Sequence, residues 1–310
     1  MDLSALDPVK LALSLIIAAT PLLFAALGEL ITEKSGVLNL GVEGMMIVGA
    51  IGGFATGLNT GSLALGVAAA AAAGMALAAL FALMTQYLMS NQVATGLALT
   101  LFGLGVAALA GQDYAGKTLD VGGKLDIPGL TDLPVIGPLL FGHDALVYLS
   151  LLMAVAVWRF LTRSRAGLVL RAVGENHDAA HAIGYPVRLV RVGAILFGGA
   201  MAGIGGAYLA LVQTPLWVEG MTAGRGWIAL AIVVFAAWRP WRALLGAYLF
   251  GGVTIVQLNL QALGVAIQSQ YLSMAPYLVT IIVLAIISAD RARARLDAPA
   301  CLGRPFHAAS

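Results

Sequence analysis

The stretch RVGAILFGGAMAGIGGAYLALV, residues 191–212, decides the fold class. After its first arginine it carries no charged side chain over residues 192–212, which are 21 in all. A helix needs about 20 such residues to cross roughly 30 Å of hydrocarbon. Apolar and polar residues do not alternate here, as they would in a strand of a membrane barrel. The stretch therefore predicts a transmembrane helix.

Similar runs recur along the whole chain of 310 residues, of which 60% are hydrophobic and only 10% charged, with a mean hydropathy of +0.94. Soluble domains carry about 25% charged residues. We predict an all-α, polytopic membrane protein of about nine transmembrane helices (eight to ten), forming one domain over residues 1–310. The runs are 11–27, 37–56, 63–86, 93–110, 145–161, 191–212, 226–238, 243–262 and 271–289. The run 226–238 is short enough to be either a full span or a half-helix.

The arginines predict the orientation. They gather between the fifth and sixth runs, around residues 239–242 and after the last run, whereas residues 111–145 contain none. The positive-inside rule then predicts an outside N-terminus, an extracytoplasmic loop over 111–144, a cytoplasmic loop over 163–190 and a cytoplasmic tail over 290–310. The first ten residues, MDLSALDPVK, lack the basic flank of a cleaved signal peptide, so we expect 11–27 to be a retained span. A single cysteine, Cys301, excludes an intrachain disulfide.

One motif is misleading. GQDYAGKT, residues 111–118, matches the phosphate-binding pattern G-x-x-x-x-G-K-[ST]. That pattern requires a strand before the loop and a helix after it. Here an apolar run of membrane-helix length comes before, and LDVGGKLDIPGLTDLP, rich in glycine and proline, comes after. We therefore predict that this segment does not bind ATP.

Two glycine-interrupted segments stand out from the many glycines that predict close helix packing. The first, GELITEKSGVLNLGVEG (28–44), places Glu43 inside an apolar run. A carboxylate there faces a cavity or a partner; it either lines a pathway or only holds structure, through a neighbouring helix end or Lys34. The second, EGMTAGRGW (219–227), opens the short run. Such segments in the two halves of a transporter indicate a pathway between them, for which the candidate residues are Asn39, Glu43, Arg225 and Trp227.

The loop LRAVGENHDAAHAIGYP (170–186) predicts a helix of two turns over about 177–183. Asn176 is a suitable N-cap, Gly184 a suitable C′ residue, and Pro186 prevents continuation. A helix this short is not stable alone, so it must pack on its own protein or dock on a partner. His177 and His181 have i, i+4 spacing, but no third metal ligand is near them in the sequence.

These segments resemble the permease subunits of ATP-binding-cassette (ABC) importers that handle nucleosides, simple sugars and branched-chain amino acids. Within that group the chain is most similar to the shorter permease of bacterial nucleoside (guanosine-type) uptake systems. The resemblance covers nearly the whole chain and is strongest in residues 26–50, 170–187, 224–240 and 275–284. It departs at His177, where the family often has proline, and at Ala236–Ala237, where a glycine-led pair is more usual.

The resemblance implies a type II ABC importer-like permease in the bacterial cytoplasmic membrane, without a cofactor, metal site or ATPase of its own and without nucleic acid as a partner. Its implied partners are a second, different permease, a cytoplasmic ABC ATPase and an extracytoplasmic substrate-binding protein. Residues 170–186 match the loop that inserts a coupling helix into the ATPase. The coupling residues are then Arg171, Gly174, Glu175, Asn176, Ala179, Ala180, Ile183 and Gly184, with Ala179, Ala180 and Ile183 as its apolar contacts.

Other functions stay open at this point. A sugar or branched-chain amino acid permease is the nearest alternative. An ion-coupled secondary transporter would use Glu43 or Glu29 to bind the coupling ion and would need no docking helix. An intramembrane enzyme would need a Ser/His/Asp or metal constellation within the runs, and the sequence shows none.

Overall fold

The computed structural model describes residues 8–119, 136–262 and 298–307, with a few positions between 274 and 285. The regular secondary structure in this part of the chain is helical apart from two isolated β-bridges, and loops connect the helices. The helices are α1 (Pro8–Lys34), α2 (Val42–Thr60), α3 (Leu63–Ala82), α4 (Gln92–Gly111), α5 (Ile136–Phe141), α6 (Ala145–Arg163), α7 (Arg165–Glu175), α8 (His177–Ala182), α9 (Val187–Tyr208), α10 (Arg225–Phe235) and α11 (Pro240–Ala262). Two π-helical turns, Leu83–Tyr87 and Leu209–Gln213, extend α3 and α9, and a 3₁₀ turn, Gln112–Tyr114, extends α4.

Seven of the described helices are long and apolar enough to cross a membrane: α1, α2, α3, α4, α6, α9 and α11. The chain is thus a multi-pass membrane protein. The short run 226–238 becomes α10, which has only 11 residues, or about 16 Å at 1.5 Å per residue. It is a half-helix. The last predicted span, 271–289, lies outside the described residues except at a few positions, so the predicted number of nine is not tested.

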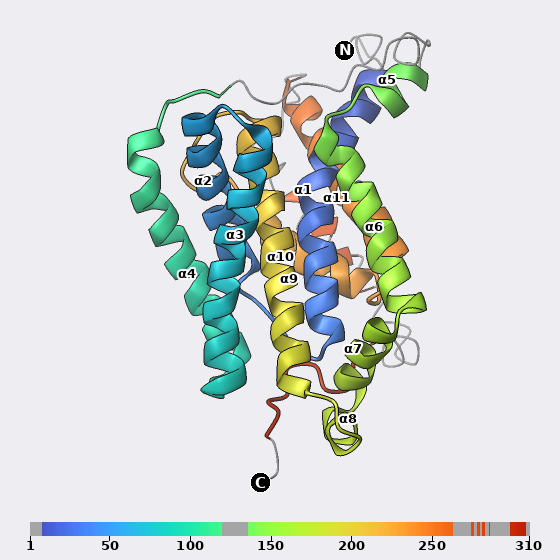
Figure 1. Cartoon of the computed structure of the whole chain (residues 1–310). Coiled ribbons are helices and arrows are strands. Elements are labelled where there is room, and N and C mark those ends of the chain that lie inside the picture. The colour runs from blue at the N-terminus through green and yellow to red at the C-terminus, as the bar shows by residue number, and fades with distance from the viewer. Residues whose placement is uncertain are drawn as a thin grey trace.

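The most buried spans occupy the middle of the bundle (Figure 1). Helix α9 packs against α1, α2 and α3, while α6 and α11 lie along the other side of α1. Glycines permit the closest of these contacts: a Cβ on Gly206 of α9 would collide with the carbonyl oxygen of Met46 on α2. The expected packing role of the intramembrane glycines is confirmed there.

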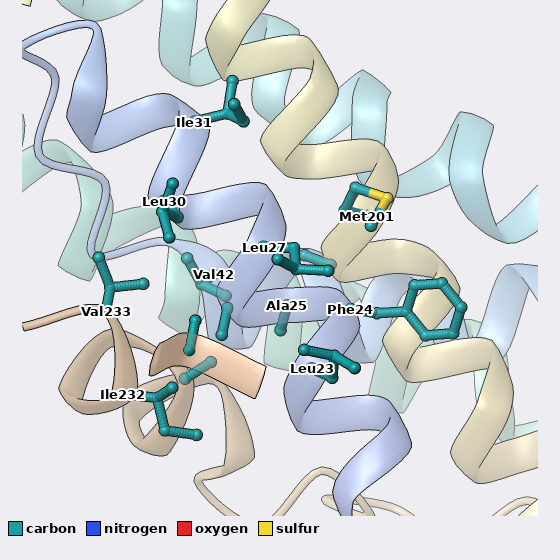
Figure 2. Close-up of a cluster of buried hydrophobic side chains, with 14 of the residues drawn as sticks. Leu23, Phe24, Ala25, Leu27, Leu30, Ile31, Val42, Met201, Ile232 and Val233 are labelled. Carbon is teal, nitrogen blue, oxygen red and sulfur yellow. The ribbon is translucent and has the colours of Figure 1, made fainter. Parts of the chain in front are cut away.

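Helix α1 joins the two halves of the core. Its side chains Phe24 and Leu27 point toward Met201 of α9, and Leu30 lies on the side of Ile232 and Val233 of α10 (Figure 2). Because α10 is only a half-helix, its apolar face is buried by packing against α1 and α2. The core thus holds the last turn of α10 against α1, and the functional site lies at the other end of α10, at its first turn.

The P-loop match is excluded by what precedes it. Helix α4 runs up to Gly111, where a strand would be required. Gly111 packs directly against the indole of Trp217, and Thr118 forms a β-bridge with Leu216. The segment is a turn that covers one end of the bundle.

Candidate functional site

The carboxylate of Glu43 joins the two glycine-interrupted segments. Its Oε1 accepts hydrogen bonds from the Thr222 hydroxyl at 2.6 Å and the Gly224 amide at 2.9 Å, and its Oε2 accepts one from the Gly226 amide at 2.6 Å. Glu43 is only 5% exposed. It lies in the first turn of α2 and receives the first amides of α10, so two helix N-termini with their partial positive charge converge on it.

Glycine is required where α10 approaches this carboxylate. Gly224 has a φ of +81°, in the left-handed region that favours glycine, and it forms the N-cap of α10. A Cβ on Gly226 would lie 2.6 Å from the Glu43 Cα. The short start of α10 is therefore shaped to fit against the start of α2.

The loop between α1 and α2, residues 35–41, is held on both sides. The Asn39 side-chain oxygen accepts from the Gly41 amide at 2.9 Å, and the Asn39 amide donates to Glu29 Oε1 at 3.2 Å. Helix α4 contributes Gln92, whose Oε1 accepts from the Leu38 amide at 2.8 Å. Asn39 is fully buried and folds back on its own loop. The apolar run predicts a span that begins near residue 37, but α2 begins at Val42 because residues 35–41 form this loop.

Arg225 and Trp227 lie in the first turn of α10. The Arg225 guanidinium donates to the carbonyl oxygens of Met221 at 2.9 Å and Thr222 at 3.3 Å, bracing the loop that enters α10. Trp227 is half-buried. The structure thus brings the four candidate pathway residues to one region, where α2 and α10 begin. Sequence reasoning missed Thr222, which carries no signal beyond its place between two glycines.

The predicted short helix is confirmed as α8, His177–Ala182. The Asn176 side-chain oxygen caps it by accepting from the Ala179 amide at 3.0 Å. Gly184 has a φ of +93°, which allows the chain to turn back toward α9. The sequence alone was sufficient to predict this helix and its two ends, because caps depend only on neighbouring residues.

The face that α8 presents differs from our expectation. Ala180 is 3% exposed and packs with Val173, Val187 and Phe306. Ala180 therefore lies on the inner face of α8 and not on the outward face where we predicted a docking contact. The outward face carries Ala179 and Ala182, followed by Ile183, which is 73% exposed. Further back, Arg171 and Glu175 are exposed on α7, while Gly174 is buried against the carbonyl oxygen of Lys34.

The inner side of α8 is covered by the C-terminal segment, residues 298–307. The ring of Phe306 contacts the rings of His177 and His181 edge-on, at centroid distances of 5.4 and 5.3 Å. The Cys301 amide donates to the Gly174 carbonyl at 2.9 Å, and the Gly303 amide donates to the Gly36 carbonyl at 3.1 Å. The tail thus links α7 and α8 to the α1–α2 loop.

Arg191 lies at the centre of this link. It is fully buried, and its guanidinium donates from Nε to the Ser35 carbonyl at 3.2 Å and from Nη1 to the Arg304 carbonyl at 2.9 Å. Its Nη2 lies 3.0 Å from His177 Nδ1. One side chain of α9 therefore joins the α1–α2 loop, the tail and α8. Sequence reasoning counted Arg191 only as an orientation marker.

The contact with Arg191 defines the state of His177. A guanidinium can only donate, so His177 Nδ1 must be the acceptor and its proton lies on Nε2, 3.6 Å from Asp178 Oδ1. Burial, and then the nearby charge of Arg191, lower the pKa of His177 from its ordinary 6.5. The neutral ring is the form that this contact requires. Among the described residues no group of three or more metal-ligating side chains includes it.

Comparison with known proteins identifies the family. Residues 11–287 match the family described as the permease component of branched-chain amino acid transport systems. The chain is 44% identical to the putative glucose ABC transporter permease protein TsgC13 of Haloferax volcanii, over 94% of this chain and 95% of that protein. It is 34% identical to the nucleoside ABC transporter permease protein NupC of Lactococcus lactis (88% and 90% covered) and 33% identical to the guanosine ABC transporter permease protein NupQ of Bacillus subtilis (95% and 97% covered). The chain belongs to this family of ABC transporter permeases.

Proposed function

We propose that this chain is one of two permease subunits that together form the translocation pathway of an ABC importer for nucleosides. The observation that carries the proposal is the double contact of α8. Its outer face, with Ala179, Ala182 and Ile183, is exposed, while its inner face is bound through Arg191 and the tail to the α1–α2 loop. This arrangement suits an element that receives movement from outside and passes it inward.

The partners follow from the family and from this geometry. A separate cytoplasmic ABC ATPase binds α8 and hydrolyses ATP, a second permease completes the pathway, and an extracytoplasmic binding protein delivers the solute. The arginine-rich end of the bundle, with 163–190 and the tail 290–310, faces the cytoplasm, and 111–144 lies outside. The host membrane is a bacterial cytoplasmic membrane.

The route of coupling runs through named contacts. Movement of α8 displaces His177 and Phe306, and with them Arg191 and the loop residue Ser35. That loop leads through Asn39 to Glu43, which holds the start of α10. We propose that the seam between α2 and α10, with Asn39, Glu43, Arg225 and Trp227, opens and closes the pathway. The solute biases this equilibrium only by its difference in affinity for the two states.

Two classes of solute are candidates, a nucleoside and a simple sugar. Relatives named for nucleoside and guanosine transport support a nucleoside, while the relative at 44% identity, named for glucose, supports a simple sugar. The test is uptake of labelled guanosine and labelled glucose into proteoliposomes that hold the complete transporter and ATP, with binding protein added. We expect ATP-dependent uptake of guanosine. ATP-dependent uptake of glucose alone would replace nucleoside by sugar. Uptake that persists without ATP would support an ion-coupled transporter and contradict the proposal.

A further inference from the structure

An apolar pocket lies between α6 and α9, apart from the Glu43 site and from α8. Its volume is about 580 Å³, within the usual range of small-molecule pockets. Helix α1, on which α6 and α9 both pack, forms the rear wall through Ile31, and α7 closes one end through Val169 and Leu170. Every residue that lines the pocket is apolar, so its chemistry suits hydrocarbon and not a polar solute.

The pocket lies within the membrane, in the half nearer the arginine-rich end of the bundle. It borders residues 153–160 of α6, which ends at Arg163, and residues 186–197 at the start of α9. Helix over the second range rises roughly 16 Å at 1.5 Å per residue. This is about half of the ~30 Å of a hydrocarbon core, so the pocket has the depth of one leaflet.

The pocket opens sideways between the two spans. Ile31 and Val157 at its rear are buried, whereas Ala156 of α6 and Leu189 and Gly193 of α9 are exposed. Leu189 is 64% exposed. Since these residues belong to membrane spans, the opening faces either acyl chains or another transmembrane helix.

Gly193 keeps the opening wide. Most glycines of α9 are tightly packed; a Cβ on Gly199, for example, would collide with the Cβ of Ala78 on α3. A Cβ on Gly193 would instead meet no atom within 4 Å. Helix packing therefore does not explain this glycine, and a larger side chain there would extend into the mouth of the pocket.

The closed end decides between the two occupants. A transmembrane helix is about 10–12 Å wide with its side chains, and it has to continue through the membrane boundary. Helix α7 contacts α1, α6 and α9 there and blocks that path (Figure 1). A flexible acyl chain can enter from the side and end inside the pocket. Its headgroup then lies at the boundary near Arg163, which is exposed two turns from Ala156 on the same face of α6 and attracts lipid phosphate.

We propose that this pocket holds one acyl chain of a membrane phospholipid. The chain fills the space between α6 and α9 against α7, and the headgroup stays outside the mouth. Because α7 leads directly into the N-cap of α8, the bound chain braces the helix that carries α8. Binding is independent of which solute is transported; only the significance of the bracing rests on the proposed role of α8.

Photolabelling tests the proposal on the full-length permease in nanodiscs, both alone and in the assembled transporter. The probe is phosphatidylcholine with a photoreactive diazirine in its acyl chain, and mass spectrometry maps the labelled residues. Leu152 and Met153 are neighbours on α6, but Leu152 is 62% exposed and lies outside the pocket, while Met153 lines it. We expect Met153 and Phe197 to be labelled at least as strongly as Leu152, although both are less exposed.

Two variants fill the pocket from opposite walls, Gly193→Leu from α9 and Ala156→Leu from α6. Each should lower the labelling of Met153, relative to Leu152, about fifteenfold if leucine displaces two CH₂ groups at roughly 0.8 kcal/mol each. Gly105→Leu is the matched control, because Gly105 on α4 also has open space around its Cβ position and does not line the pocket. It should leave the labelling of Met153 unchanged.

Three results would overturn the proposal. Labelling of Leu152 without Met153 and Phe197 would show that lipid stays outside the pocket. Undiminished labelling of Met153 in both filling variants would show that the label reaches it by another route. Loss of this labelling when the transporter assembles would assign the pocket to a partner subunit. None of these results depends on ATP hydrolysis or on uptake, so the proposed function is tested separately.

Hydrogen exchange tests the bracing of α7. In delipidated, detergent-extracted permease, the amides of residues 166–175 should exchange faster than after phosphatidylcholine is added back. This difference should shrink in Gly193→Leu and persist in Gly105→Leu. A difference of the same size in all three proteins would show that the lipid in the pocket does not brace α7.

Discussion

At the scale of single residues, Glu43 shows what a buried carboxylate does in this membrane protein. Three donors converge on it: one hydroxyl and two backbone amides of the α10 entry. A group that only accepts is therefore satisfied on both oxygens. The hydrogen bond to a neighbouring helix end, one of the two contacts expected for a structural Glu43, is present. Because that helix end lies on the proposed moving seam, the pathway role stays a prediction.

Glu43→Gln should lower stability. Glutamine keeps the shape but offers one acceptor oxygen, and its NH₂ group would face a donor, so at least one buried hydrogen bond is lost. We expect a loss of about 1–3 kcal/mol, seen as a lower unfolding temperature of the detergent-solubilised protein. Glu219→Gln, at an exposed acid of the same loop, is the control and should have no effect. An unchanged unfolding temperature for Glu43→Gln, with transport abolished, would show that Glu43 acts on the solute or on gating instead.

The sequence predicted that Glu43 lies within an apolar span and faces a cavity or a partner, but it did not identify which residues bond to it. The carboxylate lies 183 residues from Gly226 in the chain, and no local pattern relates the two positions. Arg191 was missed for the same reason, since two of its three acceptors, the carbonyl oxygens of Ser35 and Arg304, lie more than 100 residues away. Features that depend only on neighbouring residues, such as the N-cap at Asn176 and the turn at Gly184, were predicted correctly.

At the scale of elements, α8 shows why a short amphipathic helix is hard to orient from sequence. Two turns contain three alanines, and any of them can face inward. The choice is made by Phe306, which lies 126 residues beyond Ala180 and fills the space beneath the helix. Once that cover is in place, Ile183 and Ala182 remain outside.

The contact between His177 and Arg191 should make the position of α8 sensitive to acid. The pKa of His177 is lowered while α8 packs against Arg191 and Phe306. When α8 detaches from them, His177 therefore binds a proton more readily. The free energy that holds α8 against Arg191 and Phe306 is therefore at its full value above the ordinary pKa of 6.5, and it falls as the pH drops below that value. The groups that face this ring are Asp178, Arg191, Arg304 and His307. We expect amides of residues 177–183 to exchange hydrogen faster at about pH 5 than at about pH 8, after correction for the intrinsic rate.

A matched pair of variants isolates this effect. In His177→Asn, an amide oxygen that does not titrate can accept from Arg191, so the pH dependence should shrink. In His181→Asn, which changes the exposed histidine on the same phenylalanine, the pH dependence should persist. Equal pH dependence in wild type and His177→Asn would contradict the assignment.

At the scale of the whole molecule, composition and run length were enough to predict a polytopic helical membrane protein. They also indicated that 226–238 is short, and α10 is a half-helix because 11 residues of helix precede a turn with two strained positions. They could not predict that the C-terminal segment 298–307 returns to clamp α8 and the α1–α2 loop. That segment is neither strongly apolar nor periodic, and it is held by backbone hydrogen bonds, by the Arg191 side chain and by the packing of Phe306.

The P-loop match leads to a prediction at the same scale. Lys117 lies 5.3 Å from the centre of the Tyr114 ring, in an exposed turn after α4. Since no nucleotide is expected there, Lys117→Ala should leave solute uptake and ATP hydrolysis of the complete transporter near wild-type rates. Loss of ATP hydrolysis in a fully assembled complex would overturn the proposed division of labour.

The central claim is that a separate ATPase drives this permease through the outer face of α8. The most direct measurement is co-purification of the ATPase with detergent-extracted permease, combined with solute-stimulated ATP hydrolysis, for Ile183→Arg and Ala180→Arg. Ile183 is 73% exposed and Ala180 only 3%. Ile183→Arg should release the ATPase and abolish stimulation while the unfolding temperature of the permease stays unchanged. Ala180→Arg should lower that temperature, because it forces a charge into the contact with Phe306. If Ile183→Arg retains the ATPase and full stimulation, α8 is an ordinary surface helix and the claim is contradicted.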